Sequence, residues 1–442
     1  MPRGTEKRGE ERVAGGRTAL IIVRSPATHN SRELREAQIL RDLGYRPRIL
    51  GVVSEQVRER QATVQGIPVT RLSPTSPLSW VKMWLGKSRS PSTAAPGSAG
   101  SPSRNADAGG ATSLAIRVHR WFRTIDYYRR AVAAVRDLRP DLIHCNDYNT
   151  MWVGVAARLM FGATVVYDCH ELWPDRNLRP EPRWWLLACE FLFVRCAHRT
   201  ITASPGYAEI MARRYRIPPP QVIRNIPADA PPDASASGDL TAHPADASPA
   251  TGEPFVVYVG ALTSGRGLEV SIRAVARVPG ARLRLVGPSH DHYRAELGEL
   301  ARREGVADRV EMAGAVPPGR LLDAIREASV GLVLIEPVCL SYRMSLPNKL
   351  FEYVAAGIPV LGSDLPSIGR LIVEHQIGLL AQPDEVSDIA AKLGEMLEPR
   401  RNHEFRLAVR TAAERLRWEG ESQLLADTYI QATARARTRP PA

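Results

Sequence analysis

The sequence lacks the features that mark membrane-spanning, secreted and metal-stapled proteins. No apolar run reaches the roughly 18 residues that a membrane-spanning helix needs, so an integral membrane protein is not expected. The charged start, Met1–Gly16, has no apolar core, so we expect no secretory signal there. The cysteines form no CxxC pair and no paired-histidine zinc pattern, which predicts buried thiols in a reducing, cytoplasmic compartment. They are Cys145, Cys169, Cys189, Cys196 and Cys339.

The composition is that of a soluble globular chain of two ordinary domains. Of 442 residues, 44% are apolar and 24% are charged, which is close to the balance of folded soluble proteins. Domains usually have roughly 100–200 residues. Glycine and proline are slightly more frequent than average, which indicates local loops and linkers and not a disordered chain.

The formal net charge of +12 is unevenly distributed. Residues 71–139 carry a net charge of +9, whereas residues 228–253 carry −5. The basic segment contains a short helix expected at its start, with Trp80 and Trp84 on one side. A Ser/Pro/Ala/Gly-rich insertion over 86–111 has no periodicity, and we expect it to be disordered.

An arginine-rich helix with Trp121 and Phe122 is expected to follow the insertion. Basic helices that carry tryptophan and phenylalanine hold peripheral proteins on anionic membrane surfaces. We therefore expect contact with an anionic membrane through residues 77–130, on the inner face of the plasma membrane, and no nucleic-acid partner. The alternative is that the apolar stripe of this helix packs on its domain and the arginines are merely solvated.

Short apolar runs alternate with helical patterns on both sides of the acidic stretch. Strands that alternate with helices predict an α/β fold with parallel sheets covered on both faces. We expect an N-terminal Rossmann-like domain over 17–227, a flexible linker over 228–253 and a second Rossmann-like domain over 254–400. An Arg-rich helix and tail follow over 401–442. Two such doubly wound domains would face a cleft and bind ligands at the carboxyl ends of their strands.

The expected strands and helices can be stated by range. Strands are predicted over 18–23, 48–53, 141–144, 164–167, 199–203, 221–224, 255–259, 282–286, 310–312, 330–335 and 359–362. Helices are predicted over 33–43, 151–161, 268–278, 290–304, 318–328, 348–356 and 387–397, with one more that begins near Ser204.

A glycine-rich segment, YVGALTSGRGLE, links a predicted strand to a predicted helix. The loop exposes backbone N–H groups and a helix N-terminus, both of which attract phosphate. Arg266 could add a bidentate cationic contact. The spacing of Gly260, Gly265 and Gly267 differs from the dinucleotide fingerprint G-x-G-x-x-G. Ordinary turn chemistry is the alternative explanation of these glycines.

The second motif, SLPNKLFEY, follows a predicted strand and contains a predicted helix start. A proline and Asn348 stand where the helix would begin, so free N–H groups near Ser345 and Leu346 should point at a ligand. Glu352 lies about one turn into the helix, on the face shared with Asn348 and Lys349. Its carboxylate could accept two hydrogen bonds from a ribose diol. The alternative is that Glu352 pairs with Lys349 on a solvated surface.

Together these segments resemble the family 4 glycosyltransferases of the GT-B fold, which are retaining and nucleotide-sugar-dependent. The most specific piece is SLPNKLFEYVAAGIPVLGSDLPSI (345–368), supported by the glycine-rich segment and by YDCHELWPD (167–175). The resemblance covers nearly all of the chain outside 86–111 and 228–253. It implies the GT-B fold and a sugar-transfer activity, with 17–227 as the acceptor domain and 254–400 as the nucleotide-sugar-binding domain.

The resemblance also implies roles for individual residues. Glu352 would hold the donor ribose, Arg266 would contact the donor diphosphate, and His170 would line the donor sugar and the reaction centre. We take these three as the catalytic residues. Asn225 matches an asparagine just before the hinge. The expected donor-binding residues are Gly260, Gly265, Arg266, Ser345, Leu346, Asn348, Lys349 and Glu352.

The sequence departs from the family pattern at three places. The first glutamate of a spaced pair falls at Met344, and an arginine common after the strand glycine falls at Ala261, which leaves the donor sugar open. The usual Gly-Gly pair of the first loop is missing from residues 24–33, which leaves the acceptor contact open.

No metal and no other cofactor are expected. GT-B enzymes hold the diphosphate with helix dipoles and basic residues, so the resemblance requires no cation. His170, Glu171 and Asp175 would be a poor set of metal ligands, and His144 with Asp147 would be no better.

The expected function is a retaining glycosyltransferase that moves a sugar from a UDP- or GDP-sugar to a hydroxyl of a glycan or lipid-linked acceptor. Its expected setting is cell-envelope or exopolysaccharide synthesis. Two alternatives remain open. One is a nucleotide-sugar epimerase or glycan phosphorylase on the same fold, and the other is a non-catalytic, membrane-associated scaffold.

Overall fold

The computed structural model describes most of the chain. The described residues are 16–28, 32–54, 56–77, 106–177, 181–228 and 254–438, with the backbone alone over 106–116 and at 318. The expected Trp80/Trp84 helix lies outside them, as do residues 86–105 of the expected insertion and all but the first residue of the expected linker. Two compact units make up the chain: Met1–Val165 with Arg435–Ala442, and Val166–Ala434.

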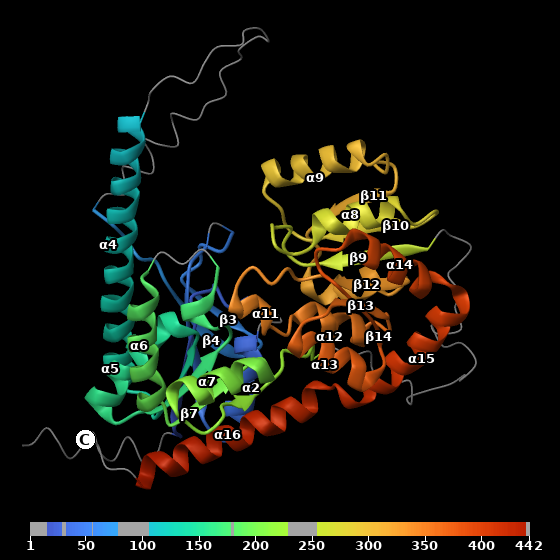
Figure 1. Ribbon diagram of the computed structural model, residues 1–442. Helices are drawn as coiled ribbons and strands as arrows, with labels where there is room; N and C mark the ends of the chain where they lie inside the picture. Colours follow the sequence, from blue (N-terminus) through green and yellow to red (C-terminus); the bar gives the residue numbers. More distant parts are fainter. Residues whose placement is uncertain are drawn as a thin grey trace, which may run out of the picture. The chain divides into compact units, whose positions relative to one another are not determined.

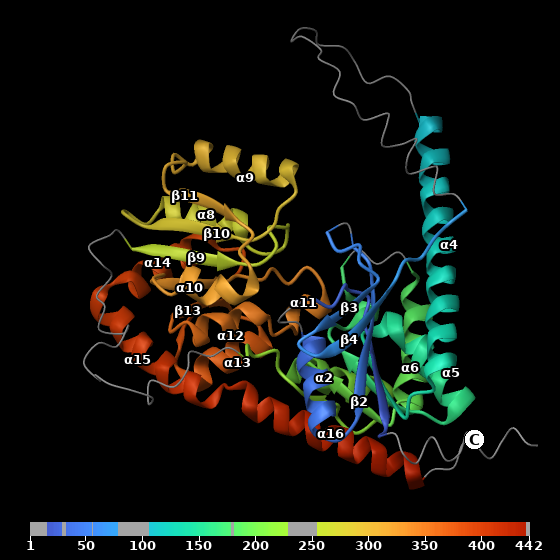
Figure 2. The same cartoon turned by 180° about the vertical axis from the view of Figure 1, so that it is seen from behind.

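The first unit is built on a sheet whose strands lie in the order β3-β4-β2-β1-β5. The strands are β1 (Thr18–Ile22), β2 (Arg46–Val52), β3 (Gln61–Val64), β4 (Ile67–Leu72) and β5 (Leu142–Asn146). All neighbours are parallel except β3, which is antiparallel to β4. The helices are α2 (Arg32–Asp42), α4 (Ala106–Leu138), η1 (Tyr148–Thr150) and α5 (Met151–Phe161). Helices α4 and α5 lie side by side (Figures 1 and 2).

Helix α4 begins earlier than the sequence patterns indicate. It starts at Ala106, so the prediction of a disordered insertion is wrong for residues 106–111, which are helical. Alanine is the strongest helix former, and alanines at 106, 108 and 111 support this first stretch in spite of two glycines.

Strands β3 and β4 form a hairpin that the sequence analysis missed. Gln65 and Gly66 between them both have positive φ angles, 51° and 75°. A two-residue turn of this kind matches the right-handed twist of paired strands. The signal was present, because QATV and IPVT flank a glycine-containing pair and have the alternation of a strand.

The second unit begins with three parallel strands in the order β6-β7-β8. They are β6 (Thr164–Cys169), whose first two residues belong to the first unit, β7 (Arg199–Thr202) and β8 (Gln221–Val222). The helices of this stretch are η2 (Trp173–Asp175), α6 (Arg183–Cys196) and α7 (Pro205–Tyr215). The predictions included α7 and all three strands but not α6.

A six-stranded parallel sheet of order β11-β10-β9-β12-β13-β14 follows in the second unit. The strands are β9 (Phe255–Val259), β10 (Arg282–Val286), β11 (Val310–Gly314), β12 (Val330–Val333), β13 (Val360–Ser363) and β14 (Gly378–Ala381). The strand order reverses between β9 and β12. Ligands of open α/β sheets bind at such a switch point, outside the carboxyl ends of the strands.

Helices cover both faces of this sheet. The helices are α8 (Leu268–Ala276), α9 (Asp291–Arg303), η3 (Pro318–Arg320), α10 (Leu321–Ile325), α11 (Leu340–Arg343), α12 (Asn348–Ala355), α13 (Pro366–His375) and α14 (Val386–Leu397). Residues of α8, α9 and α14 form one buried apolar cluster, and residues of α10, α12 and α13 belong to a second. Figure 2 shows α8 and α9 together on one side of this sheet.

The C-terminal segment holds two helices where one long helix was predicted. Helices α15 (Pro399–Arg415) and α16 (Trp418–Thr438) are separated at Leu416, whose ψ of 67° is not helical. Glu421 of α16 is buried and accepts hydrogen bonds from the backbone N–H and the Nε of Arg224, at 2.6 and 2.7 Å. Among the described residues, no helix is long and apolar enough to cross a membrane.

Candidate active site

The glycine-rich loop between β9 and α8 is fixed by backbone hydrogen bonds at the carboxyl ends of the central strands. The Gly260 N–H donates to the carbonyl of Val286 at 2.9 Å, and the Glu336 N–H donates to the carbonyl of Gly265 at 3.2 Å. Gly267 has a φ of 71°, and a Cβ there would lie 2.2 Å from the carbonyl oxygen of Leu334. Only glycine fits this approach, so the loop is tied to the ends of β10 and β12.

Arg266 is positioned by an aromatic ring. Its guanidinium carbon lies 4.7 Å from the centre of the Tyr342 ring, which belongs to α11. Stacking of this kind restrains a long side chain while its N–H donors remain available for a bidentate contact. The Tyr342 ring therefore restrains the side chain of Arg266, the loop arginine that was predicted to contact phosphate.

The backbone before α12 differs in one respect from the expectation. The Ser345 N–H is not free, because it donates to the carbonyl of Tyr342 at 3.2 Å, and the Ser345 hydroxyl donates to the same carbonyl at 2.8 Å. Leu346 is buried in the second apolar cluster. Met344, at the place of the family's first glutamate, contributes its carbonyl as acceptor for the Ser367 hydroxyl at 2.9 Å. The segment is therefore a stiff turn.

Lys349 of α12 is buried next to the loop, which argues against a solvated pair with Glu352. Its residue exposure is 7%, and its Nζ has no hydrogen-bond partner among the described atoms. The Nζ lies 3.5 Å from the centre of the Tyr258 ring. Burial lowers the pKa of Lys349 well below its usual value, Arg266 lowers it further, and Glu352 opposes both.

Glu352 is largely buried on the same helix. Burial raises the pKa of the Glu352 carboxyl, and Lys349 acts in the opposite direction. Both groups are thus shifted toward their neutral forms, as expected of ionisable side chains that leave water without full hydrogen bonding. A polar ligand would supply the missing partners.

Tyr353, which the sequence analysis did not single out, fixes α12 against β9. Its hydroxyl accepts from the Val259 N–H at 2.9 Å and lies 3.2 Å from the carbonyl oxygen of Val257. A Cβ at position 331 would lie 2.5 Å from the Tyr353 ring, so Gly331 makes room for it. The tyrosine therefore sets the register between Glu352 and the start of the glycine-rich loop.

Two further carboxyls border the loop and were also missed. Glu269, in the first turn of α8, accepts from the Tyr293 hydroxyl at 2.6 Å. Burial and the neighbouring Glu269 raise the pKa of Glu336, while a backbone hydrogen bond from Gly267 lowers it. The sequence signal was their position, since Glu269 opens a helix and Glu336 follows β12 closely.

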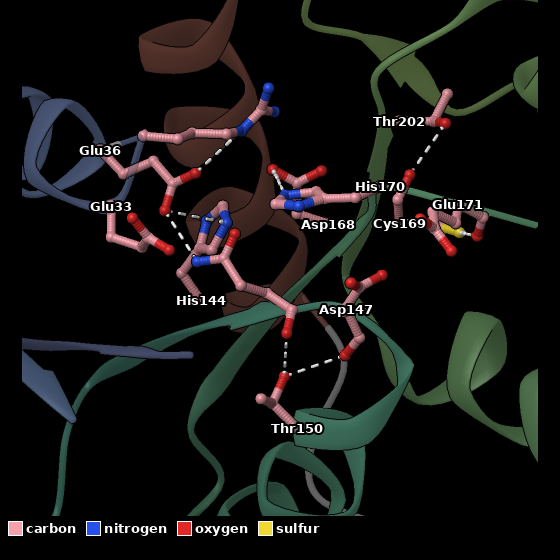
Figure 3. A network of polar contacts seen from close by, with 12 residues as sticks. Glu33, Glu36, His144, Asp147, Thr150, Asp168, Cys169, His170, Glu171 and Thr202 are labelled. Atoms are coloured by element: carbon pink, nitrogen blue, oxygen red, sulfur yellow. Dashed lines mark hydrogen bonds and ion pairs between the residues drawn. The ribbon is translucent and has the colours of Figure 1, made fainter. Parts of the chain in front are cut away.

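His170 lies just after β6 and is oriented by a buried acid. The Asp168 Oδ2 is 3.4 Å from the His170 Nε2 (Figure 3). The Thr202 hydroxyl donates to the carbonyl of Cys169 at 3.0 Å and supports the strand end between them. Asp168 was missed, although residues two apart on a strand point to the same side.

Asn225, which matches the family's asparagine before the hinge, lies three residues after β8.

The first unit contains a buried polar network at the end of β5 (Figure 3). Glu36 and His144 are fully buried, with the Glu36 Oε2 3.4 Å from the His144 Nε2. Asn146 donates to the same carboxyl at 2.9 Å, and the Arg32 Nε donates to the other oxygen at 3.1 Å. Asp147 has a φ of 70° and a ψ of 164°, a strained conformation typical of functional strand ends. Sequence reasoning did not single out Glu36 or Asn146.

A cavity of about 730 Å³ lies at the carboxyl ends of β12, β13 and β14. Its polar lining includes Arg343, Asp364, Arg370 and Asp384. It has the volume of a small-molecule site.

Comparison with known proteins identifies the family. Residues 30–227 match the family described as glycosyl transferase 4-like domain, and residues 253–399 match glycosyl transferases group 1. The chain therefore belongs to the glycosyltransferases of family 4 type, which have the GT-B fold and are transferases. This confirms the family resemblance.

Curated relatives agree with this assignment. The D-inositol 3-phosphate glycosyltransferase of Nocardia farcinica is 29% identical over 275 residues, which are 59% of this chain and 59% of that protein. The D-inositol 3-phosphate glycosyltransferase 2 of Catenulispora acidiphila is 27% identical over 65% of this chain and 70% of its own length. The match to the Nocardia protein thus spans less than two thirds of either chain.

Solved structures confirm the predicted fold class of two parallel-sheet α/β domains. Sucrose-phosphate synthase from Thermosynechococcus elongatus has a TM-score of 0.69 at 19% identity, over 95% of this chain and 99% of that one. Anabaena HepE, in complex with UDP and glucose, has a TM-score of 0.64 at 17% identity, over 94% and 99%.

Proposed function

We propose that this glycosyltransferase moves a sugar, with retention of configuration, from a UDP- or GDP-sugar to a hydroxyl of its acceptor. One observation carries the proposal: the loop that holds Arg266 and the helix start that holds Lys349 and Glu352 meet at the carboxyl edge of one sheet. The position of Lys349 Nζ against the Tyr258 ring joins the two motifs. The complex of HepE with UDP and glucose supports a donor of this chemical class.

Departure of the nucleotide diphosphate is the step these residues would assist. The leaving group develops negative charge, and donors that are already in place stabilise that charge most effectively. Arg266 would supply a fixed guanidinium, and the N-terminus of α12 would add its partial positive charge. A metal is not needed in this scheme. Attack from the same face, assisted by the leaving phosphate, would give retention without a dedicated carboxylate base.

Glu352 would bind the donor ribose. A ribose diol donates two hydrogen bonds, and hydrogen bonds to a carboxylate favour its charged form. Donor binding would therefore offset the burial that raises the pKa of this carboxyl in the free protein. His170, held by Asp168, would line the sugar.

The acceptor is proposed to be a glycan or a lipid-linked sugar in cell-envelope or exopolysaccharide synthesis. The relatives are named for D-inositol 3-phosphate, so a phosphorylated polyol belongs among the acceptors tested. The test is a donor screen with purified protein that follows release of UDP or GDP in the presence of each acceptor class. Release that depends on one donor and one acceptor supports the proposal, and absence of release with every pair counts against it.

Release or rearrangement of the donor without any acceptor would instead favour an epimerase, and phosphate-dependent release would favour a phosphorylase. A non-catalytic scaffold would show no nucleotide binding by calorimetry while keeping its membrane or partner contacts. The same set of measurements therefore distinguishes the epimerase, the phosphorylase and the scaffold from a glycosyltransferase.

Peripheral contact with an anionic membrane on the cytoplasmic side is proposed for α4. Trp121 is 61% exposed and Ile125 is 43% exposed, whereas Tyr127 and Val135 further along the helix are buried. Only the first half of the described helix face therefore offers apolar side chains to lipid, with exposed arginines around them.

Flotation with vesicles that contain anionic lipid tests this contact. The variant Trp121→Ala should float less than the parent chain. The matched double variant Trp184→Ala, Trp185→Ala removes another exposed pair, on α6. Loss of flotation in the double variant alone would move the contact to α6, and absence of flotation of the parent chain would remove it.

A further inference from the structure

Lys349 has an environment that calls for an anionic ligand. Its amine is more than nine-tenths buried and has no hydrogen-bond partner among the described atoms. A Cβ placed on Gly260 would be 3.6 Å from Nζ, so the amine lies directly against the start of the glycine-rich loop. A protonated lysine amine has three donors, and leaving them unpaired in a buried place is costly.

The groups that act on this amine come from β9, the glycine-rich loop and α12 itself. The Tyr258 ring of β9 lies 3.5 Å away, and Arg266 of the loop adds a like charge. Glu352 of the same helix adds the opposite charge. Tyr342 of α11 stacks on Arg266 and interacts with Tyr258.

Burial and Arg266 outweigh Glu352 in this balance. Burial is the largest influence and lowers the pKa of Lys349 well below its usual range, in the direction that Arg266 reinforces. The attraction between an ammonium and a ring face is small compared with the loss of hydration of a buried charge. Without a ligand, this balance therefore shifts the amine toward its neutral form.

We propose that Lys349 is a second ligand of the donor diphosphate, and that its amine takes up a proton from solvent as the diphosphate binds. The inference rests on the proposed function. Residues 258–269 contain a single basic residue, Arg266. Ala261 stands where the family commonly has a second one, an arginine. Lys349 of α12 thus supplies a second basic group next to the loop.

The proton uptake follows from charge. A diphosphate brings at least two negative charges next to the amine, which favours its protonated form and raises its pKa. At Glu352 these charges favour the protonated form, whereas the ribose hydrogen bonds favour the charged form, so the two effects oppose each other. The predicted proton uptake on donor binding therefore comes from Lys349.

Calorimetry of the full chain measures this uptake. UDP-glucose and GDP-mannose are suitable probes, because their diphosphates carry no proton that titrates near neutral pH. Each is titrated at about pH 7.5 in two buffers of different ionisation enthalpy, and the difference in observed enthalpy gives the number of protons exchanged. The variants are Lys349→Met and, as matched control, Lys392→Met on α14, whose amine is partly exposed and pairs with Asp388.

The expected result is uptake of between about half a proton and one proton by the parent chain and by the control. The Lys349→Met variant should bind about ten- to a hundred-fold more weakly and take up markedly less. Thermal unfolding shows whether the variant is folded. Tight binding without uptake by the parent chain, or unchanged affinity in Lys349→Met, overturns the inference while the proposed function stands. Binding of neither probe overturns the nucleotide donor and the inference with it.

Discussion

The carboxylate of Asp168 lies 3.4 Å from the Nε2 of His170, at the carboxyl end of β6. Asp168 is fully buried, while the His170 side chain is 31% exposed. A buried acid of this kind fixes the orientation of an imidazole that faces a ligand. The pair explains how a loop residue can hold a defined position.

Replacing Asp168 by Asn should lower kcat about ten-fold or more, because the imidazole loses its charged partner. The donor KM should change far less, since the proposed nucleotide contacts, Arg266 and Glu352, are other residues. Steady-state kinetics with the donor found in the screen measures both values. The control is Glu171→Gln, at a neighbouring side chain that is 44% exposed. If the donor KM rose by the same factor while kcat stayed unchanged, Asp168 would serve donor binding and not the orientation of His170.

Gly267→Ala should disrupt the β9–α8 loop. The new Cβ would lie 2.2 Å from the Leu334 carbonyl oxygen in a backbone of φ 71°. Gly280→Ala has nearly the same φ, 73°, with no atom within 4 Å of its Cβ, and is the matched control.

The control should lose about 1–2 kcal/mol of unfolding free energy, which is the cost of a left-handed alanine. Gly267→Ala should lose more and should also weaken nucleotide binding at least about ten-fold. Urea unfolding and calorimetry check the two effects. Equal losses in both variants would show that the Leu334 contact does not hold the loop.

Tyr353→Phe removes a hydroxyl that the backbone of β9 needs. The Val259 N–H would lose its 2.9 Å acceptor in a fully buried place. The expected loss of unfolding free energy is about 1–3 kcal/mol, measured by urea unfolding. Tyr342→Phe, at a partly exposed site, should lose less. Unchanged stability in Tyr353→Phe would mean that water or another group replaces the hydroxyl.

Glu190 predicts a pH dependence of stability. Burial raises the pKa of its carboxyl from 4.5 to about 7, although hydrogen bonds from Tyr215 and Tyr167 act in the opposite direction. The folded protein keeps this proton up to about pH 7, whereas the unfolded chain releases it near 4.5. The contribution to stability is therefore complete below the unfolded pKa and is lost as the pH rises through the folded one.

The loss should be on the order of 2 kcal/mol between about pH 5 and about pH 8. Glu190→Gln keeps one acceptor oxygen for the two tyrosine hydroxyls, replaces the other oxygen with an amide donor and removes the titration. Glu336 and Glu352 also have raised pKa values, so the difference between parent and variant isolates Glu190. Urea unfolding across this range checks it. If the unfolding free energies of the parent chain and of Glu190→Gln changed equally with pH, the raised pKa of Glu190 would be contradicted.

Most strands were predicted because they are short runs rich in aliphatic residues, but β3, β4 and β14 were missed. Strand β10 covers the predicted residues, and β9 does too. Helix α6 escaped prediction because Trp184, Trp185 and Phe191 are exposed on an otherwise apolar helix, which removes the contrast between its faces. The break between α15 and α16 has no glycine or proline to signal it.

The buried polar partners could not be predicted in the same way. Glu36 is bound by Asn146, 110 residues further along the chain. Nothing local marks such a glutamate as buried, because the partners that compensate its charge come from a distant segment. Arg266, Lys349 and Glu352 could be named, since a glycine-rich loop and a helix start have recognisable local patterns. Tyr353 lies in the same motif, but its role depends on β9.

The central claim is that Arg266 and Glu352 bind the nucleotide part of a sugar donor. The most direct measurement is donor-dependent release of UDP or GDP by Arg266→Ala and Glu352→Ala, compared with Arg302→Ala on the exposed face of α9. Turnover should fall at least about ten-fold in the first two and remain unchanged in the third. Unchanged sugar transfer in both Arg266→Ala and Glu352→Ala would contradict the account.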